Sequence, residues 1–113
     1  MNVSSLAGVT AFTTKDGSTI RELHHTEAQS LAEAELAPEQ STQRHYHAVT
    51  EEIYFIETGR GEMEVGGARR DVGPGDAVLI PAGTWHKIRA ASDPLRFLCC
   101  CVPPYRDDDT FFA

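Results

Sequence analysis

The chain has few cysteines, few basic residues and no long apolar run, and each shortage excludes a class of protein. Its three cysteines, Cys99, Cys100 and Cys101, are consecutive, and an odd number cannot form a complete internal disulfide framework. No apolar run approaches the roughly 20 residues of a membrane-spanning helix. Ten Lys and Arg stand against 17 Asp and Glu, a formal charge of −7, and such an acidic domain repels the phosphates of nucleic acids. We therefore expect no membrane span and no nucleic-acid partner.

The length and composition indicate a single globular domain. Domains typically hold about 100–200 residues, and this chain has 113. Its hydrophobic fraction of 41% and charged fraction of 24% are those of an ordinary soluble domain. We expect one domain over residues 1–113, with a core at about 18–102, an N-terminal arm at 1–17 and a C-terminal tail at 103–113.

The first residues, MNVSSLAGVTAF, have neither the basic start nor the long apolar stretch of a secretory signal peptide. This pattern favours a cytoplasmic protein, in which the three cysteines are small, buried and reduced side chains. A redox or metal-binding role for these cysteines is the alternative, but no CxxC spacing supports it.

Short extended runs separated by turn residues dominate the chain. Residues 30–37 alternate apolar and acidic side chains, which is typical of a half-buried strand, and Gly66-Gly67 is a typical hairpin turn. The nine predicted strands are residues 18–25, 30–37, 42–47, 52–58, 62–65, 69–72, 77–80, 86–90 and 95–102. With no convincing helix, this pattern predicts an all-β sandwich or barrel.

Three of the five histidines lie where they could share a metal ion. His45 and His47 are two positions apart on a predicted strand, so their side chains point to the same face. Glu52 opens the next predicted strand and can reach the same interior, and His86 follows a turn at Pro81. Three imidazoles and one carboxylate suit a first-row transition metal. Spacing alone leaves open the alternative of ordinary surface or core histidines.

Two segments of the chain resemble the motifs of the cupin superfamily. The first has the spacing HxH-x4-E-x6-G, carried by His45, His47, Glu52 and Gly59. The second has the spacing G-x5-P-x-G-x2-H, carried by Gly75, Pro81, Gly83 and His86. The resemblance covers residues 30–102 and implies a small single-domain cupin, a conserved barrel domain. The fold it implies is a jelly-roll β-barrel of two packed antiparallel sheets.

The resemblance also implies the ligands of a metal. One divalent transition metal, Fe, Mn, Ni, Zn or Cu, would be held by His45, His47, Glu52 and His86. Glu51 is less suited than Glu52, because it stands one residue further from the motif glycine and strand alternation turns it away.

Two positions depart from the family pattern. Glu39 stands where the first motif usually opens with glycine, and Ala90 stands where the second usually ends with asparagine. Neither position is a metal ligand, so the departures put turn geometry and supporting hydrogen bonds in doubt.

The proposed ligands show which face of each strand points inward, and strand alternation then predicts further side chains around the metal. The ligand pocket is expected to include Gln43, Tyr54, Met63 and Phe97. No general base can be assigned from spacing. The candidates for acid–base catalysis are Glu52, if it releases the metal, Tyr54, and a metal-bound hydroxide.

Three functions are compatible with the sequence. The first is a metal-dependent enzyme acting on a small oxygen-rich metabolite by dioxygenase, isomerase, lyase or decarboxylase chemistry, as small cupins do. The second is a non-catalytic module that binds a metal or a small ligand, such as a sensor. The third is a structural or assembly domain whose histidines are remnants.

The resemblance further implies a homodimer, because cupins commonly pair through sheet edges or faces. The C-terminal tail is a candidate for crossing onto the partner. It carries Phe111 and Phe112, and burial of a phenylalanine side chain stabilises a protein by about 1.5–3 kcal/mol.

Overall fold

A computed structural model describes residues 1–113, and it consists almost entirely of short β-strands joined by turns. The strands are β1 (Phe12–Thr13), β2 (Thr19–His25), β3 (Ser30–Leu36), β4 (His45–His47), β5 (Glu51–Thr58), β6 (Gly61–Val65), β7 (Ala68–Val72), β8 (Ala77–Ile80), β9 (His86–Ala90), β10 (Leu95–Val102) and β11 (Thr110–Phe112). The two helical segments are single 3-10 turns, η1 (Leu6–Gly8) and η2 (Asp107–Asp109). Neither has the length or apolar character needed to cross a bilayer.

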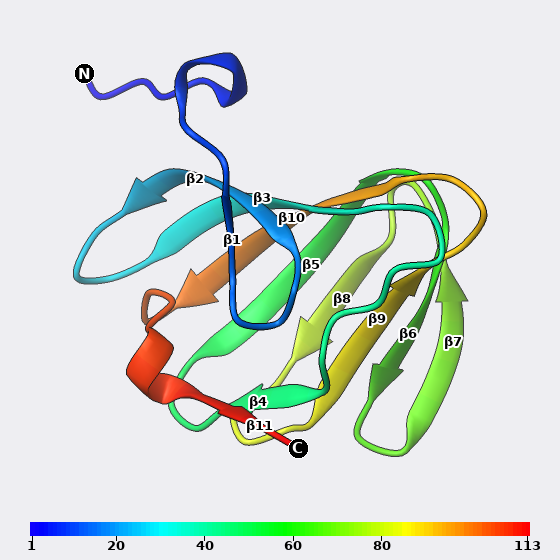
Figure 1. The fold of residues 1–113 in the computed structure, drawn as a ribbon. Helices are drawn as coiled ribbons and strands as arrows, with labels where there is room; N and C mark the ends of the chain where they lie inside the picture. The colour runs from blue at the N-terminus through cyan, green and yellow to red at the C-terminus, as the bar shows by residue number, and fades with distance from the viewer.

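The strands form two antiparallel sheets that pack on one another (Figure 1). One sheet has six strands in the order β1-β2-β3-β10-β5-β8, and the other has five in the order β11-β4-β9-β6-β7. The expected all-β jelly roll of two packed antiparallel sheets is therefore confirmed.

All nine predicted strands are present, but the third is shorter than expected. It begins at His45 rather than at residue 42. Thr42 is buried and bonds to Ile88 through both its backbone and its hydroxyl, which accepts from the Ile88 N–H at 3.1 Å. In this contact with β9 the Thr42 hydroxyl takes the place of a backbone carbonyl as acceptor, so the regular strand ladder begins only at His45.

Two strands were not predicted, and both lie in the segments expected to flank the core. In the N-terminal arm, β1 pairs with β2. In the C-terminal tail, β11 pairs with β4, which places Phe112 opposite His45. Phe111 stacks on Tyr46 with a ring separation of 5.1 Å. The tail therefore lies along the strand that carries two of the histidines, within its own chain (Figure 1).

The hydrophobic core lies between the sheets and follows the expected alternation. Along β5, Glu52, Tyr54 and Ile56 point inward and are buried, whereas Ile53 and Phe55 are exposed on the outer face. The buried apolar cluster consists of Ala34, Leu36, Tyr54, Ile56, Met63, Val72, Ile80, Ile88, Ala90, Leu95 and Phe97. Its polar end is where the histidines lie.

The turn between β5 and β6 packs directly against the connection between β9 and β10. Gly59 has φ +83°, a left-handed conformation that favours glycine. A Cβ atom at this position would lie 2.2 Å from the carbonyl oxygen of Pro94. The motif glycine is therefore required both by its backbone conformation and by the close approach of the neighbouring chain.

Candidate metal centre

Three histidine side chains converge at one end of the space between the sheets. His45 and His47 lie on β4, and His86 lies directly opposite His45 on the neighbouring strand β9. One ring nitrogen from each lies within 4.8 Å of the others, and all three side chains are buried. The HxH spacing therefore places both β4 imidazoles toward the interior, as strand geometry requires.

Backbone carbonyls orient two of these rings. Nδ1 of His45 donates to the carbonyl of Gln43 at 2.8 Å, and Nδ1 of His86 donates to the carbonyl of Thr84 at 3.0 Å. Because a carbonyl only accepts, each Nδ1 carries a proton and each neutral ring leaves Nε2 unprotonated. Burial, followed by the proximity of His86, lowers the pKa of His45, which favours this neutral state.

A hydroxyl group orients the third ring. The side chain of Thr110 donates to the carbonyl of Arg106 at 2.8 Å, so its oxygen is free to accept from Nδ1 of His47 at 3.2 Å. With its proton on Nδ1, the neutral ring of His47 likewise has an unprotonated Nε2, which faces the interior.

Glu52 completes the cluster from β5. Its Oε1 lies 3.3 Å from Nε2 of His47 and 3.6 Å from Nε2 of His86, and its Oε2 accepts from the thiol of Cys101 at 3.3 Å. Burial alone would raise the pKa of Glu52, but the two imidazoles lower it to about 2. The carboxylate is therefore ionised. Glu51, the less suited neighbour, is exposed.

The cluster presents electron pairs toward its own centre, where a proton or a metal ion would satisfy them. Glu52 Oε1 and His86 Nε2 are buried without a hydrogen-bond partner. A proton on His47 relieves this in part: burial alone would lower the pKa of His47, but Glu52 raises it. Three imidazole nitrogens and one carboxylate oxygen are also a donor set that could hold a divalent transition metal.

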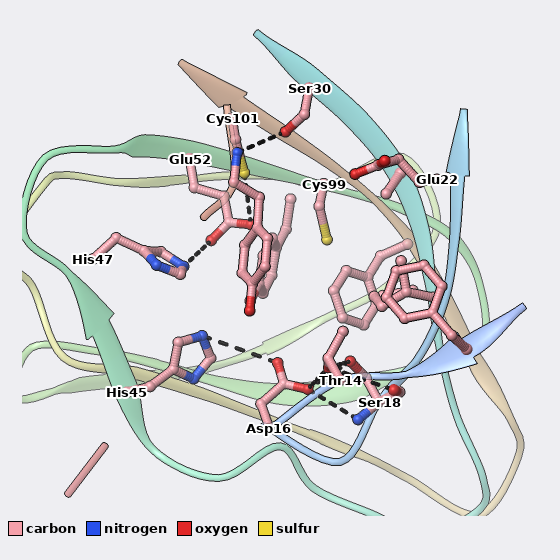
Figure 2. A pocket seen from close by; sticks show the side chains of 17 residues that line it. Thr14, Asp16, Ser18, Glu22, Ser30, His45, His47, Glu52, Cys99 and Cys101 are labelled. Carbon is pink, nitrogen blue, oxygen red and sulfur yellow. Dashed lines mark hydrogen bonds and ion pairs between the residues drawn. The ribbon is translucent and has the colours of Figure 1, made fainter. Parts of the chain in front are cut away.

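A small cavity of about 60 Å³ adjoins the cluster. Its polar side includes His45, His47 and Glu52, and Asp16 of the N-terminal arm faces them across it (Figure 2). Much of the remaining lining is apolar, and it includes Phe12, Ile20, Tyr54, Phe97, Cys99 and Tyr105. The cavity therefore combines one polar wall with a lining that is otherwise largely apolar.

Two of the four expected pocket residues line this cavity, and two lie elsewhere. Tyr54 and Phe97 pack side by side in its wall with a ring separation of 4.6 Å. Gln43 precedes the first residue of β4, so strand alternation does not apply to it, and its side chain is exposed. Met63 does point inward, but β6 lies beyond β9 from β4 and places it in the hydrophobic core.

Two groups that shape the site were missed by sequence reasoning. Asp16 faces His45 from the arm, and Thr110 contacts His47 from the tail. Both are more than 25 residues from the histidine they contact. The tail was singled out only as a candidate for crossing onto a partner, and no local pattern relates either residue to such a distant histidine.

Neither side chain considered as a general base has a pKa near neutrality. Glu52 is a weak base, and burial raises the pKa of Tyr54 well above its ordinary value, so its phenol stays protonated. Burial likewise raises the pKa of Cys99 and Cys101, so both thiols are neutral. All three cysteines are free. Efficient acid–base catalysis favours groups with a pKa close to the working pH.

Comparisons with known proteins agree with this architecture. The cupin domain family model matches residues 32–101. An uncharacterised protein of Methanocaldococcus jannaschii is 45% identical over 105 residues, which cover 88% of this chain and 84% of the relative. KdgF from Halomonas sp. has a TM-score of 0.83 at 22% identity and covers 93% of this chain and 94% of its own. Oxalate decarboxylase from Bacillus subtilis has a TM-score of 0.85 at 21% identity, with 99% of this chain but 32% of the decarboxylase covered.

Proposed function

Since the chain belongs to the cupin family, we propose that it binds one divalent transition metal through His45, His47, Glu52 and His86 and acts there on a small metabolite. The observation that carries this proposal is the pair of buried acceptors, Glu52 Oε1 and His86 Nε2, which face each other at 3.6 Å without a donor. A proton on His47 would satisfy Glu52 alone, whereas a divalent cation would satisfy both acceptors, and the donor set suits Fe, Mn, Ni, Zn or Cu.

Side chains of the protein would orient the ligands and the substrate. Cys101 donates to Glu52 and holds one of its oxygens, which leaves the other for the metal. The protonated phenol of Tyr54 lines the cavity and can donate a hydrogen bond to a bound molecule. When bound, the ion supplies Lewis-acid polarisation of a coordinated oxygen.

The size of the cavity supports a substrate of few atoms. Its volume of about 60 Å³ is far below the roughly 300–1,000 Å³ of pockets for drug-sized ligands. We therefore favour a small oxygen-rich metabolite, transformed by dioxygenase, isomerase, lyase or decarboxylase chemistry.

A second function is supported by a different observation. Glu52 and Tyr54 both have a pKa far from neutrality, so neither is well suited to transfer a proton at neutral pH. A non-catalytic module that holds the metal and a small ligand, as a sensor does, needs no such group.

Elemental analysis of protein purified without added metal tests the metal, with one equivalent per chain as the expected result. A panel of small metabolites, assayed under air with defined metals, then separates the two functions. Oxygen uptake or substrate loss that disappears in His86→Ala supports the enzyme, whereas tight binding without turnover supports the module. His24→Ala is the matched control, because His24 is exposed on β2. Protein that carries no metal under any loading condition would overturn the proposal.

We also propose that the protein is a homodimer that pairs through the outer face of the six-stranded sheet. Ile53 and Leu79 are direct neighbours there and are 41% and 55% exposed, and Phe55 adjoins them. Contiguous exposed apolar side chains are typical of protein–protein interfaces. Light scattering should report twice the monomer mass, and Leu79→Lys should shift the protein toward monomer.

A further inference from the structure

The N-terminal arm places a carboxylate over the candidate metal centre. Asp16 lies in the turn between β1 and β2, and three hydrogen bonds converge on its Oδ1. These come from the Thr14 hydroxyl at 2.6 Å, the Ser18 hydroxyl at 2.6 Å and the Ser18 N–H at 2.9 Å. The backbone carbonyl of Asp16 accepts from the N–H of Gln43 at 2.9 Å, which ties the turn to the segment that leads into β4. The side chain is therefore fixed rather than free to swing into solvent.

The second carboxylate oxygen is left for the cavity. Oδ2 of Asp16 lies 4.0 Å from Nε2 of His45, beyond hydrogen-bond distance, and no other side chain donates to it (Figure 2). Asp16 is only 16% exposed, and it lines the cavity directly. A molecule bound beside the metal would therefore meet an acceptor with free lone pairs.

Apart from the proposed histidine ligands, the charged side chains around the cavity are all acidic. Asp16, Glu22 and Glu52 line it, and no lysine or arginine does. Basic side chains are the usual means by which proteins hold carboxylates and phosphates, often as paired hydrogen bonds from arginine. With Glu52 and Asp16 offsetting the charge of a divalent ion, the site offers no surplus positive charge to a second anion.

We propose that Asp16 determines the specificity of this cavity, accepting a hydrogen bond from a small uncharged ligand and repelling small anions. This inference rests on the proposed metal-binding function, because the metal is what holds an oxygen of the same ligand. The ligand class is a small neutral molecule with one metal-binding oxygen and one N–H or O–H donor, such as a hydroxy amide or a diol. Of the chemistries proposed above, such a ligand fits all but decarboxylation, whose substrates carry a carboxylate.

Glycolamide and glycolate are a matched pair of probes for this inference. They have the same number of heavy atoms and both offer two oxygens to a metal, but only glycolamide is neutral and has an N–H group. The affinity of each is measured by calorimetry on nickel-loaded protein, and the ratio of the two dissociation constants is compared between the wild type and Asp16→Asn. The asparagine variant can keep Oδ1 as the acceptor of the turn hydrogen bonds while it replaces Oδ2 with a donor.

Asp16→Asn should shift the preference toward glycolate by at least tenfold, through tighter glycolate and weaker glycolamide binding. Asp93→Asn, which removes an exposed carboxylate in the β9–β10 connection, should leave the ratio unchanged. Nickel content is measured first in all three proteins. A wild type that takes up no metal overturns the proposed function and this inference with it. If the metal-loaded wild type and Asp16→Asn have ratios that agree within twofold, the role of Asp16 is overturned and the proposed metal-binding function is not.

Discussion

Thr110 holds Nδ1 of His47 at 3.2 Å while its own hydroxyl proton is committed to the carbonyl of Arg106. The contact joins the C-terminal tail to a histidine that lies 63 residues earlier in the chain. Asp109 reinforces it by accepting from the N–H groups of Ala48, Val49 and Thr50 at 3.1 Å each. The tail therefore supports the connection from β4, which carries two of the histidines, to β5, which carries Glu52.

Removing this hydroxyl should weaken metal binding. In Thr110→Val the shape is kept but His47 loses the acceptor that fixes its tautomer, and such supporting contacts are typically worth 10–100-fold in metal affinity. Chelator competition should therefore show an affinity about 10-fold lower than in the wild type. Thr110→Ser keeps the hydroxyl and should restore most of the affinity. Equal affinities for the valine and serine variants would contradict the role assigned to Thr110.

Removing a proposed ligand should abolish binding without unfolding the protein. His47→Ala leaves three of the four proposed ligands, and we expect it to lose most of its metal while its circular dichroism spectrum stays that of the wild type. His24→Ala, at an exposed position, should retain full metal content. If His47→Ala retains one equivalent of metal per chain, the ligand assignment is wrong.

A carboxylate on the outer face of the six-stranded sheet should make stability depend on pH. Burial and the neighbouring Glu33 carboxylate raise the pKa of Glu57, and Arg96 opposes this in part. Because the folded-state pKa lies above the unfolded value, the stabilisation is fully present below about pH 4.5 and is lost as the pH rises through the folded-state value. At neutral pH the ionised Glu57 therefore destabilises the fold.

Glu57→Gln should increase the free energy of unfolding at pH 7 by a few tenths of a kcal/mol, the lower part of the range of about 0.2–1 kcal/mol for directly opposed strand pairs, because β10 separates Glu57 from Glu33 and water screens the partly exposed carboxylate. Urea denaturation at pH 4 and pH 7 measures this, and the gain should be smaller at pH 4. Glu62→Gln, at an exposed position on β6, should change neither value. A glutamine variant that is less stable than the wild type at pH 7 would refute the unfavourable ionisation of Glu57.

The close approach at Gly59 gives a prediction about stability. Gly59→Ala combines a left-handed backbone conformation with a Cβ atom 2.2 Å from the Pro94 carbonyl, and we expect it to cost roughly 2–4 kcal/mol. Gly67→Ala is the matched control, because a Cβ there meets nothing within 4 Å and its φ is not in the left-handed range. Thermal unfolding should separate the two variants by about 10 °C or more.

The sequence was sufficient to predict the strands that carry a pattern. Alternation identified the inward side chains of β5, and the turn residues marked most boundaries, so the two-sheet architecture followed. The strands β1 and β11 have two and three residues, which is too short for any periodicity to be recognised. Their formation depends on pairing with β2 and β4, and that pairing is a tertiary contact.

The proposed ligands were predictable because their spacing matches a known motif, whereas the rest of the site depends on distant segments. Tyr54 lies two residues after Glu52 on the same strand, so alternation places both in the interior. Asp16 and Thr110 reach the site from opposite ends of the chain, and no local rule relates them to β4. Gln43 shows the converse: a local rule was extended beyond the point where the strand begins.

The four proposed ligands lie on three strands, and a chain without its two sheets cannot bring them together. Ion uptake is then thermodynamically linked to folding, since only the native state offers a complete site. At a free ion concentration 100 times the dissociation constant, this linkage adds about 2.7 kcal/mol to native-state stability. The melting temperature should therefore rise with the logarithm of ion concentration, and the concentration at which the rise begins would give the affinity without any knowledge of a substrate.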